Sequence, residues 1–287
     1  MFKVEKGTLY IVATPIGNMG DITYRAVEVL REVDCVAAED TRVSGKLLSK
    51  LEIKKPLISY YDHNKAYKGN VVTERLKKGE SIALITDAGT PCVSDPGAEL
   101  VKLCAVSGIP VVPIPGVSAA VTALSVCGMN SGRFAFEGFL PANKKKRAER
   151  IEKLKTEDRE TVIYTAPHDA LTDITDLYNG LGDRETVICR EMTKLNESYV
   201  YTTLGGAVKL ISDGEVPSKG EFAIVIRAST EKALPDWAKL SVLEHIALFE
   251  SQGMAHMDAI KAVAAERGMS KREVYGIALS AKDADGN

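Results

Sequence analysis

The stretch from Ile82 to Gly97 constrains the fold more than any other part of this chain. A short apolar run, Ile82–Ile85, predicts a buried strand, and a loop of Asp, Gly, Pro and Ser follows it directly. A helical pattern then begins near Ala98. In open α/β sheets, ligands bind at loops that follow the carboxyl ends of the strands. The small residues of this loop expose backbone groups and Asp87 supplies an acceptor, so the pattern predicts a polar, nucleoside-like ligand.

Strand and helix patterns alternate through the first half of the chain. They occur in the order strand 9–13, helix 22–33, strand 35–38, helix 71–77, strand 82–85, helix 98–107 and strand 111–114. This alternation predicts a mostly parallel sheet that helices cover on both faces. A strand and connector are expected at 134–141, and further strands at 161–164, 186–189, 197–203 and 221–226. Helices are expected from 144 onward, between the strands at 161–164 and 186–189, and at 207–212. They indicate a second, smaller α/β domain with some antiparallel pairing.

The C-terminal part of the chain carries only helical patterns. Capping-box pairs occur at Ser241–Glu244 and Ser270–Glu273, and Gly253 and Gly268 mark two helix ends. Three short helices with a turn near Gly268 resemble a helix-turn-helix. A helical cap that packs against the body or against a second subunit explains the same pattern. We therefore expect three parts, at residues 1–133, 134–232 and 233–287, in a chain too long for one ordinary domain.

Composition excludes several classes of protein. With 45% hydrophobic and 26% charged residues, the chain is typical of a soluble globular protein. No apolar run has the length of a membrane span and the N-terminus is no signal peptide, so a cytoplasmic protein is expected. The five cysteines and four histidines lack metal-ligand spacing, which predicts buried thiols and no metal site. A net charge of −2 leaves only local basic patches for nucleic acid.

A set of loop motifs gives the most specific information. The first loop, from Thr14 to Asp21, lacks both the lysine of a P-loop and the glycine pattern of a dinucleotide fingerprint. Together with six later segments it resembles the tetrapyrrole methylase superfamily and, more narrowly, its branch that methylates ribosomal RNA. The matching segments are Ala13–Asn18, Ala38–Arg42, Ser59–Asn64, Thr86–Gly97, Pro115–Ala119, Arg190–Lys194 and Gly220–Phe222. The resemblance runs from about Gly7 to Arg227, and the helical tail has the place of that branch's extension.

The resemblance implies a fold and an activity. The fold would be two α/β domains of the tetrapyrrole methylase type with the cofactor cleft between them, plus a small C-terminal helical extension. The activity would be transfer of a methyl group from S-adenosylmethionine to the ribose 2′-hydroxyl of a cytidine in the decoding region of 16S ribosomal RNA. The partner would be 16S ribosomal RNA or the small ribosomal subunit, and the protein would be a homodimer.

The resemblance also implies which residues contact the cofactor. Matching positions lie in the first loop, in the loop after Ile85, after Pro115-Gly116, and in the second domain: Pro15, Asp87, Val93, Ser118, Ala119, Tyr164 and Met192. Tetrapyrrole-modifying relatives have a compact Gly-Asp-Pro where this chain has the longer Asp87–Pro91. Thr90 and Ser94 are therefore added as candidates from the same loop.

The expected chemistry also needs a group that accepts a proton. A ribose hydroxyl is a poor nucleophile at neutral pH, so a positioned acceptor should assist it. The candidates are Glu39, Asp40 and His63, and Arg42 could hold a phosphate or a base with its planar guanidinium. Structural roles are equally open: Asp40 as a helix cap, Arg42 in an ion pair with Glu39 or Asp40, and His63 as a solvated turn residue. The sequence assigns no single base.

Two basic patches are candidates for RNA contact, because phosphate neutralisation and stacking of bases on aromatic rings drive such binding. Lys65 and Lys68 lie among tyrosines and His63. A denser run, Lys144, Lys145, Lys146 and Arg147, opens a charged helix near the connector between the two domains. A solvated helix face is the plain alternative for that run.

Two other functions fit the same motifs less closely. One is methylation of a tetrapyrrole or another small molecule, which would need an apolar and roomy acceptor cleft. The other is a non-catalytic RNA-binding or assembly module that uses the C-terminal helices and has no need of intact cofactor loops. The polar segments Glu39–Arg42 and Tyr60–Asn64 favour an RNA substrate. Titration with S-adenosylmethionine separates the non-catalytic alternative from the two enzymes.

Overall fold

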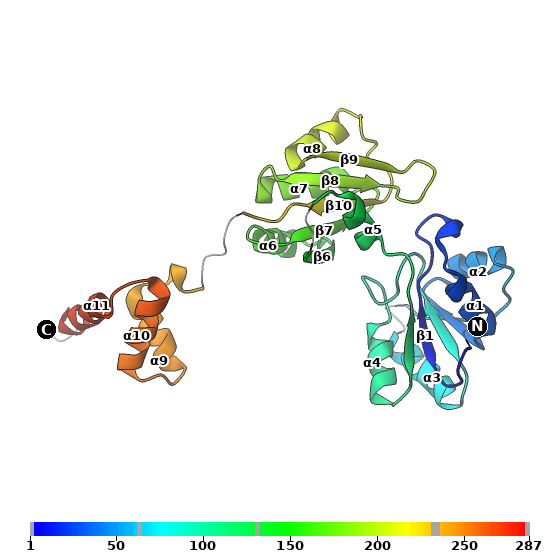
Figure 1. The fold of residues 1–287 in the computed structure, drawn as a ribbon, viewed down its shortest axis with the longest axis horizontal. Helices are drawn as coiled ribbons and strands as arrows, with labels where there is room; N and C mark the ends of the chain where they lie inside the picture. Colours follow the sequence, from blue (N-terminus) through cyan, green and yellow to red (C-terminus); the bar gives the residue numbers. More distant parts are fainter. Residues whose placement is uncertain (1–2, 62–64, 130–131, 231–235, 285–287) are drawn as a thin grey trace. The chain divides into compact units, whose positions relative to one another are not determined.

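The computed structural model describes residues 3–61, 65–129, 132–230 and 236–284. The chain divides into two compact units, Met1–Thr230 and Glu231–Asn287, which we call the first and second units and describe separately (Figure 1). Within the described ranges, no helix has the length and apolar character needed to cross a membrane.

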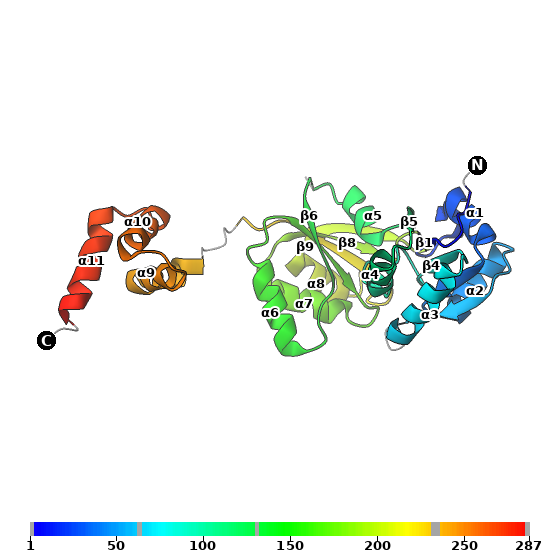
Figure 2. The ribbon, with the colours of Figure 1, turned by 90° about the horizontal axis from the view of Figure 1, so that it is seen from below.

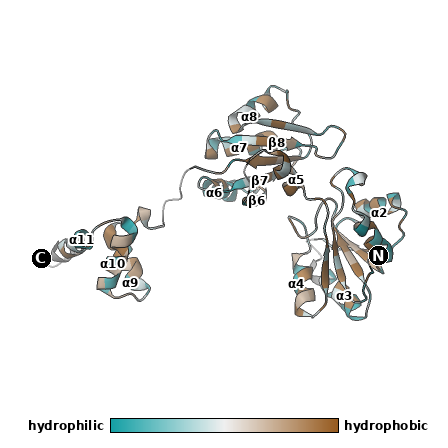
Figure 3. Ribbon diagram, in the orientation of Figure 1, coloured by the Kyte–Doolittle hydropathy of each residue, from teal (hydrophilic) through white to brown (hydrophobic). Residues whose placement is uncertain are grey.

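The first unit begins with a parallel five-stranded sheet in the order β3-β2-β4-β1-β5. Its strands are β1 (Leu9–Val12), β2 (Cys35–Ala38), β3 (Leu57–Ser59), β4 (Ile82–Ile85) and β5 (Val111–Ile114). Every residue of β2 and β4 is buried, as the continuous apolar runs predicted for a sheet covered on both faces. Figure 3 shows these strands in hydrophobic colours. The predicted parallel sheet is therefore confirmed.

Helices cover both faces of this sheet. The helices that follow its strands are α1 (Tyr24–Glu32), α2 (Thr41–Lys50), α3 (Lys65–Lys77), α4 (Ala98–Val106) and α5 (Ala119–Val126). The short helix η1 (Met19–Asp21) lies between β1 and α1. Side chains of α1 and α2 pack with one face of the sheet, and those of α3 and α4 with the other. The sequence did not predict β3 or the bounds of α2, although it indicated Asp40 as a possible helix cap. Asp40 begins α2 by accepting a hydrogen bond from the Arg42 backbone N–H at 2.8 Å, a local cap that hydrophobic periodicity does not register.

A second five-stranded sheet, in the order β6-β7-β10-β8-β9, completes the first unit. Its strands are β6 (Phe134–Phe139), β7 (Glu160–Thr165), β8 (Glu185–Arg190), β9 (Ser198–Thr203) and β10 (Phe222–Ile226). Only β6 and β7 pair in parallel, and the other neighbours are antiparallel. The expected antiparallel pairing in the second half of the chain is thus confirmed.

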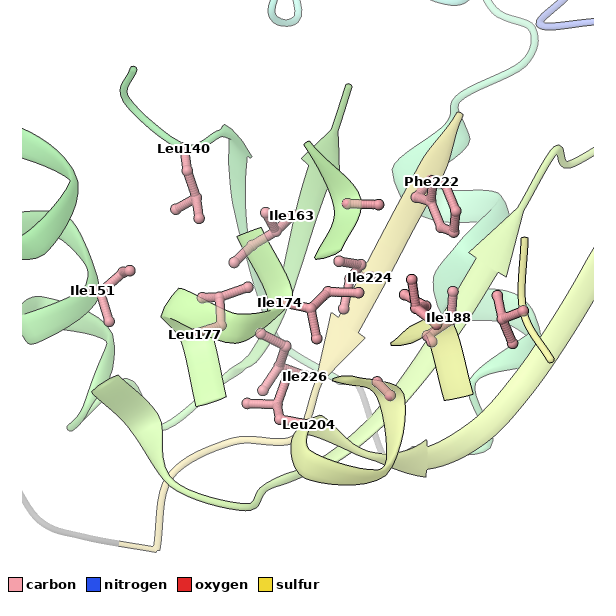
Figure 4. Close-up of a cluster of buried hydrophobic side chains, with 14 of the residues drawn as sticks. Leu140, Ile151, Ile163, Ile174, Leu177, Ile188, Leu204, Phe222, Ile224 and Ile226 are labelled. Atoms are coloured by element: carbon pink, nitrogen blue, oxygen red, sulfur yellow. The ribbon is translucent and has the colours of Figure 1, made fainter. Parts of the chain in front are cut away.

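The second sheet also has helices on both faces. One face packs against α6 (Lys144–Leu154), α7 (Ala170–Leu181) and α8 (Leu204–Ser212). There, Ile163, Ile188 and Ile224 of three neighbouring strands meet Ile174 and Leu177 of α7, all of them fully buried (Figure 4). The opposite face packs against α5, which follows the last strand of the first sheet (Figure 2). Because α5 belongs in sequence to the first sheet and in packing to the second, it joins the two.

The second unit is helical, as predicted. It contains η2 (Asp236–Lys239), α9 (Val242–Ser251), α10 (His256–Arg267) and α11 (Lys271–Ala284). Both expected capping boxes form, with reciprocal hydrogen bonds between Ser241 and Glu244 and between Ser270 and Glu273. Gly268 ends α10 in the left-handed conformation, at φ 63°. The helix-turn-helix and helical-cap interpretations both stay predictions, since they differ in what the unit contacts.

One arginine organises the second unit. The Arg267 guanidinium donates to the carbonyl oxygens of Trp237 (3.2 Å), Leu240 (2.5 Å) and Ser241 (3.1 Å), and lies 5.1 Å from the Trp237 ring centre. Its Nε also donates to Nδ1 of His245, at 3.2 Å. That ring is 1% exposed, and its Nε2 lies 3.2 Å from a Glu266 carboxylate oxygen. Because Nδ1 accepts a hydrogen bond, the geometry requires the neutral ring with its proton on Nε2.

We expect the second unit to lose stability as the pH falls below about 6.5, the ordinary pKa of histidine. Burial, followed by the charge of Arg267, lowers the pKa of His245, while Glu266 opposes the shift. The unfolded chain therefore takes up a proton that the folded unit resists. Denaturant unfolding of the full chain, followed by fluorescence of Trp237, its single tryptophan, measures this. His245→Gln should flatten the pH dependence, and His168→Gln, at an exposed histidine of the first unit, should leave it unchanged. An unaltered slope in His245→Gln would contradict the assignment.

Candidate functional site

A cavity of about 390 Å³ lies in the first unit, where loops after the strands of the first sheet meet the second sheet. The first sheet contributes the ends of three loops, which follow β1, β4 and β5, together with the residue directly after β2. The lining residues from this side are Ile16, Glu39, Thr86–Thr90, Val93–Asp95, Ser118 and Ala119. The cavity therefore lies at the carboxyl ends of parallel strands, as the sequence predicted.

Backbone and hydroxyl hydrogen bonds hold these loops together. Thr14 and Gly89 exchange backbone hydrogen bonds at 2.8 and 3.1 Å, which joins the loop after β1 to the loop after β4. The Thr14 hydroxyl donates to the Thr86 carbonyl oxygen at 3.1 Å. The Thr90 hydroxyl donates to the Val117 carbonyl oxygen at 2.8 Å, which joins the loop after β5. The three loops therefore form one preorganised surface instead of three mobile segments.

The second sheet supplies an apolar wall. Its lining residues are Phe139, Tyr164–Pro167, Met192 and Glu221–Ala223. The Tyr164 ring packs edge-on against Phe136 and Phe139, with ring centres 4.9 and 5.7 Å apart. Burial raises the pKa of the Tyr164 hydroxyl, and a hydrogen bond from the Ala120 backbone N–H opposes the shift. That hydrogen bond joins β7 to the first turn of α5. The wall can hold a flat aromatic ligand by contact with rings and a thioether.

Three carboxylates line the opposite side. Glu39 accepts a hydrogen bond from the Thr86 hydroxyl at 2.7 Å, and Asp87 accepts one from the Asp40 backbone N–H at 3.2 Å. Burial raises the pKa of Asp87, and it raises the pKa of Asp95 to about 6, with the nearby charge of Glu39 as the next cause. The site therefore combines an apolar wall with concentrated negative charge, which suits a ligand that is aromatic and also positively charged.

Most residues expected to contact a cofactor line this cavity. They are Asp87, Thr90, Val93, Ser94, Ser118, Ala119, Tyr164 and Met192. Pro15 is absent from the lining, and its neighbour Ile16 takes the place. Both backbone groups of Thr14 form hydrogen bonds with Gly89, so the loop reaches the cavity one residue later than expected. Contact of the lining residues with a cofactor stays a prediction.

The four catalytic candidates differ in whether they line the cavity. Glu39 lines the cavity, whereas Asp40 and Arg42 do not. Asp40 caps α2 and forms an ion pair with Arg42 at 2.6 Å, which matches the structural alternative for both residues. Hydrogen bonds from the Arg42 side chain lower the pKa of Asp40 to about 2, so it is a weak proton acceptor. His63 lies outside the described residues.

Sequence reasoning missed Asp95 as a site residue, although it quoted the segment that contains it. Asp95 lies in the loop between β4 and α4 and lines the cavity beside Glu39 and Asp87. An Asp-Pro pair is so common in turns that nothing in the sequence separates this aspartate from a turn residue. Its position beside two other carboxylates is a product of tertiary structure.

The cationic residues expected to contact RNA also differ from one another in their exposure. Lys144, Lys145 and Lys146 are exposed in the first turn of α6. Arg147 differs from the expectation, because its side chain is 13% exposed and pairs with Asp173 and with Asp176, the latter at 2.6 Å. It therefore belongs to the interior and we leave it out of the RNA surface. In the other patch, Lys68 is half-buried, and the side chain of Lys65 lies outside the described residues.

Comparison with known proteins identifies the family of the chain. The model of the family "Tetrapyrrole (Corrin/Porphyrin) Methylases" matches residues 8–208. A protein of Halalkalibacterium halodurans called "Ribosomal RNA small subunit methyltransferase I" is 43% identical over 95% of this chain and 95% of its own length. A protein of the same name from Bacillus subtilis is 40% identical over 95% of this chain and 94% of its own length. One from Escherichia coli O157:H7 is 40% identical over 96% of this chain and 96% of its own length.

Solved structures agree on the fold. Diphthine synthase superposes with a TM-score of 0.60 at 15% identity, over 77% of this chain and 90% of its own. Uroporphyrin III C-methyltransferase from Thermus thermophilus superposes with a TM-score of 0.55 at 16% identity, over 77% of this chain and 97% of its own. At such low identity these structures support the fold and nothing more. The sequence relatives are far closer, and the chain belongs to the tetrapyrrole methylase family and, within it, to the ribosomal RNA small subunit methyltransferase I proteins.

Proposed function

We propose that this chain transfers a methyl group from S-adenosylmethionine to RNA of the small ribosomal subunit. We further propose that the acceptor is the ribose 2′-hydroxyl of a cytidine in the decoding region of 16S ribosomal RNA. The observation that carries the proposal is a cavity with an aromatic wall and a carboxylate cluster, in a chain more than 40% identical to a protein named for methylation of small-subunit ribosomal RNA.

The cavity fits S-adenosylmethionine. Tyr164, Met192 and Phe222 provide apolar contacts for an adenine ring. The carboxylates on the other side can balance a positively charged sulfonium and amino group. Ser118 begins α5 without a side-chain hydrogen bond to the first turn, so backbone N–H groups there can meet a carboxylate of the ligand. When bound, this compound supplies a methyl group attached to a positively charged sulfur.

The protein's own contribution is to align the acceptor oxygen with that methyl group. Alignment of two reactants in a preorganised site supplies about 7–11 kcal/mol of a reaction barrier. The hydrogen bonds from Thr14 to Gly89 and from Thr90 to Val117 keep the three loops in a fixed arrangement, as this mechanism requires. We propose that residues 1–133 and 134–232 form the two α/β domains that supply the two sides of the cavity, with 233–287 as a helical extension.

Asp87→Ala should weaken binding of S-adenosylmethionine by about 1–3 kcal/mol, or about 5- to 150-fold in Kd. The change removes a carboxylate from the cavity and also leaves the Asp40 backbone N–H without its acceptor. Isothermal titration calorimetry measures the Kd. Asp87→Asn is the matched variant, since its amide oxygen still accepts from Asp40 while the negative charge is lost. An Asp87→Ala protein that binds as tightly as the parent would remove Asp87 from the cofactor site.

RNA binding should involve the exposed lysines of α6. Lys144, Lys145 and Lys146 can neutralise phosphates, and Lys65 and Lys68 are proposed as a second contact near the exposed Tyr61 ring. Tyr60 is 1% exposed and therefore belongs to the core, where it cannot stack on a base. Access to a ribose in folded RNA also requires displacement of the target nucleotide, which costs a few kcal/mol.

Two alternatives receive less support. A small tetrapyrrole substrate would match uroporphyrin III C-methyltransferase, but that structure is 16% identical, whereas relatives named for ribosomal RNA are about 40% identical. A non-catalytic module would not need the cavity, yet its loops are joined by several hydrogen bonds and retain the expected side chains. We therefore prefer the RNA methyltransferase.

We also propose that the protein is a homodimer and works in the cytoplasm, where ribosomal subunits are found. Apolar side chains stand exposed on the α5 side of the second sheet, among them Val121 (56% exposed) and Tyr201 of the edge strand β9 (63% exposed). Burial of such side chains against a second copy would stabilise a dimer. Light scattering coupled to size-exclusion chromatography measures the oligomeric state.

The decisive experiment incubates the protein with S-adenosylmethionine that carries a labelled methyl group and with small subunits that lack the modification. Transfer of label to 16S ribosomal RNA, at one nucleotide that becomes resistant to alkaline cleavage, is the expected result. Alkali cleaves RNA through a free 2′-hydroxyl, so resistance identifies methylation of the ribose. Label on a base would overturn the ribose assignment, and absence of cofactor binding at millimolar concentration would overturn both enzyme functions.

A further inference from the structure

The three carboxylates that the first sheet's side contributes to the cavity have different surroundings. Glu39, directly after β2, accepts a hydrogen bond from the Thr86 hydroxyl, and Asp87, after β4, accepts one from the Asp40 backbone N–H. For Asp87, burial outweighs this donor and raises the pKa. Asp95, in the loop between β4 and α4, is half-buried and lines the same cavity near both of the other carboxylates.

Burial is the first cause of the raised pKa of Asp95, at about 6, and the charges of Glu39 and Asp87 act in the same direction, while the Thr86 hydroxyl opposes the shift. The Cys92 thiol and the Tyr164 hydroxyl also lie near Asp95, and burial and, to a smaller extent, the charge of Asp95 raise the pKa of each. Asp95 therefore combines a place in the lining of the cavity with a pKa of about 6, so it is ionised at neutral pH and can still take up a proton. A general base performs best when its pKa lies near the working pH.

We propose that Asp95 is the general base of the reaction and accepts the proton of the attacking hydroxyl group. This inference rests on the proposed function and assigns its missing proton acceptor. It also bears on the acceptor class, because a ring nitrogen with a free lone pair would need no such group. In the part of the chain that the structure describes, no three or more His, Cys, Asp or Glu side chains are grouped as metal ligands, so the cluster is not explained as a metal site.

The step balances without any further reactant. The hydroxyl oxygen forms a bond to the methyl carbon as the carbon–sulfur bond breaks, and the bonding electron pair leaves with sulfur as a neutral thioether. The hydroxyl proton passes to the Asp95 carboxylate, which later releases it to water. Thr86, between Glu39 and Asp95, positions the two carboxylates and takes no proton in this scheme.

The test compares the parent with Asp95→Asn and with Glu39→Gln, the matched change at the neighbouring carboxylate. The first readout is the pH dependence of single-turnover methylation of small subunits. The parent rate should rise about tenfold per pH unit below about 6 and level off above it, since only ionised Asp95 accepts a proton. At pH 7, the methylation rate of Asp95→Asn should be lower than that of the parent by about 100-fold or more, and it should no longer level off at high pH. The rate of Glu39→Gln should still level off.

The second readout does not depend on activity. Carbon-13 NMR of protein labelled at aspartate carboxyls should show a signal that titrates near pH 6 and is missing from Asp95→Asn. Calorimetry should show that Asp95→Asn still binds S-adenosylmethionine, with a Kd that changes by much less than the methylation rate, which also shows that the variant is folded. Asp95→Glu, which restores a carboxylate, should recover part of the rate.

The outcomes separate the two proposals. A parent protein that methylates no small-subunit RNA refutes the proposed function, whatever the titration of Asp95. A parent that is active while Asp95→Asn keeps its rate and pH profile refutes Asp95 as the base. An active parent whose profile is abolished by Glu39→Gln instead assigns the role to Glu39 and overturns the inference.

Discussion

Arg147→Ala should lower the free energy of unfolding of the first unit by about 3–5 kcal/mol. Arg147 of α6 donates to Asp173 of α7 and, at 2.6 Å, to Asp176, and Asp173 in turn accepts from the Thr165 hydroxyl of β7. The Asp173 side chain is 6% exposed. Loss of the guanidinium would leave a buried carboxylate with a single hydroxyl donor, and an unpaired buried charge is costly. Denaturant unfolding followed by far-ultraviolet circular dichroism measures the change.

Lys146→Ala is the control for this prediction, because it removes a cation one residue away that points to solvent. Its effect should stay within about 0.5 kcal/mol. Asp173→Ala should destabilise the unit by a similar amount to Arg147→Ala, and the double variant by less than the sum, because the two side chains form one network. An Arg147→Ala protein that keeps parental stability and loses RNA affinity would return Arg147 to the RNA surface.

Replacement of Lys144, Lys145 and Lys146 by alanine should weaken RNA binding on the order of 100-fold at 0.1 M salt. Each lysine that neutralises a phosphate contributes about 0.7–0.9 to the slope of log affinity against log salt concentration, so the slope should fall by about 2–3. These side chains are exposed and have no structural role comparable to that of Arg147. Fluorescence anisotropy with a labelled 16S fragment at several salt concentrations measures both quantities.

The matched control changes the same charge elsewhere on the first unit. Lys50, Lys54 and Lys102 are also exposed, and their replacement by alanine should leave the salt slope within about one unit of the parent. The Kd for S-adenosylmethionine should stay unchanged in both triple variants, since these lysines do not line the cavity. Equal slopes in the two triple variants would show that α6 is not part of the RNA surface.

These two predictions separate four neighbouring cations that the sequence presents as one run. The local sequence predicts a charged helix at α6, but it does not predict which side chains of that helix contact another helix. Arg147 is buried because Asp173 and Asp176 of α7 lie against it, and those residues are 26 and 29 positions away. The wrong grouping of Arg147 therefore arose from a contact that no local pattern reports.

The catalytic candidates also show that the local sequence does not decide which of two neighbouring side chains reaches a site. Glu39 and Asp40 are adjacent in sequence and both follow β2, yet Glu39 enters the cavity while Asp40 caps α2. Side chains of successive residues at a strand end point in different directions, so adjacency cannot decide which one reaches a site. Burial, followed by the charge of Glu39, raises the pKa of Asp95, and both causes depend on the assembled fold.

By itself, the sequence determined most strands and helices, the parallel pairing of the first sheet, the capped helices of the second unit and the loops that bear the site. These features follow from periodicity, capping and turn chemistry, which act over a few residues. Only the tertiary structure decided that Arg147 is an internal ion-pair partner and that Asp95 stands with Glu39 and Asp87 around one cavity. Burial and charge–charge interactions set those properties, and both are sums over neighbours that the chain brings together only when it folds.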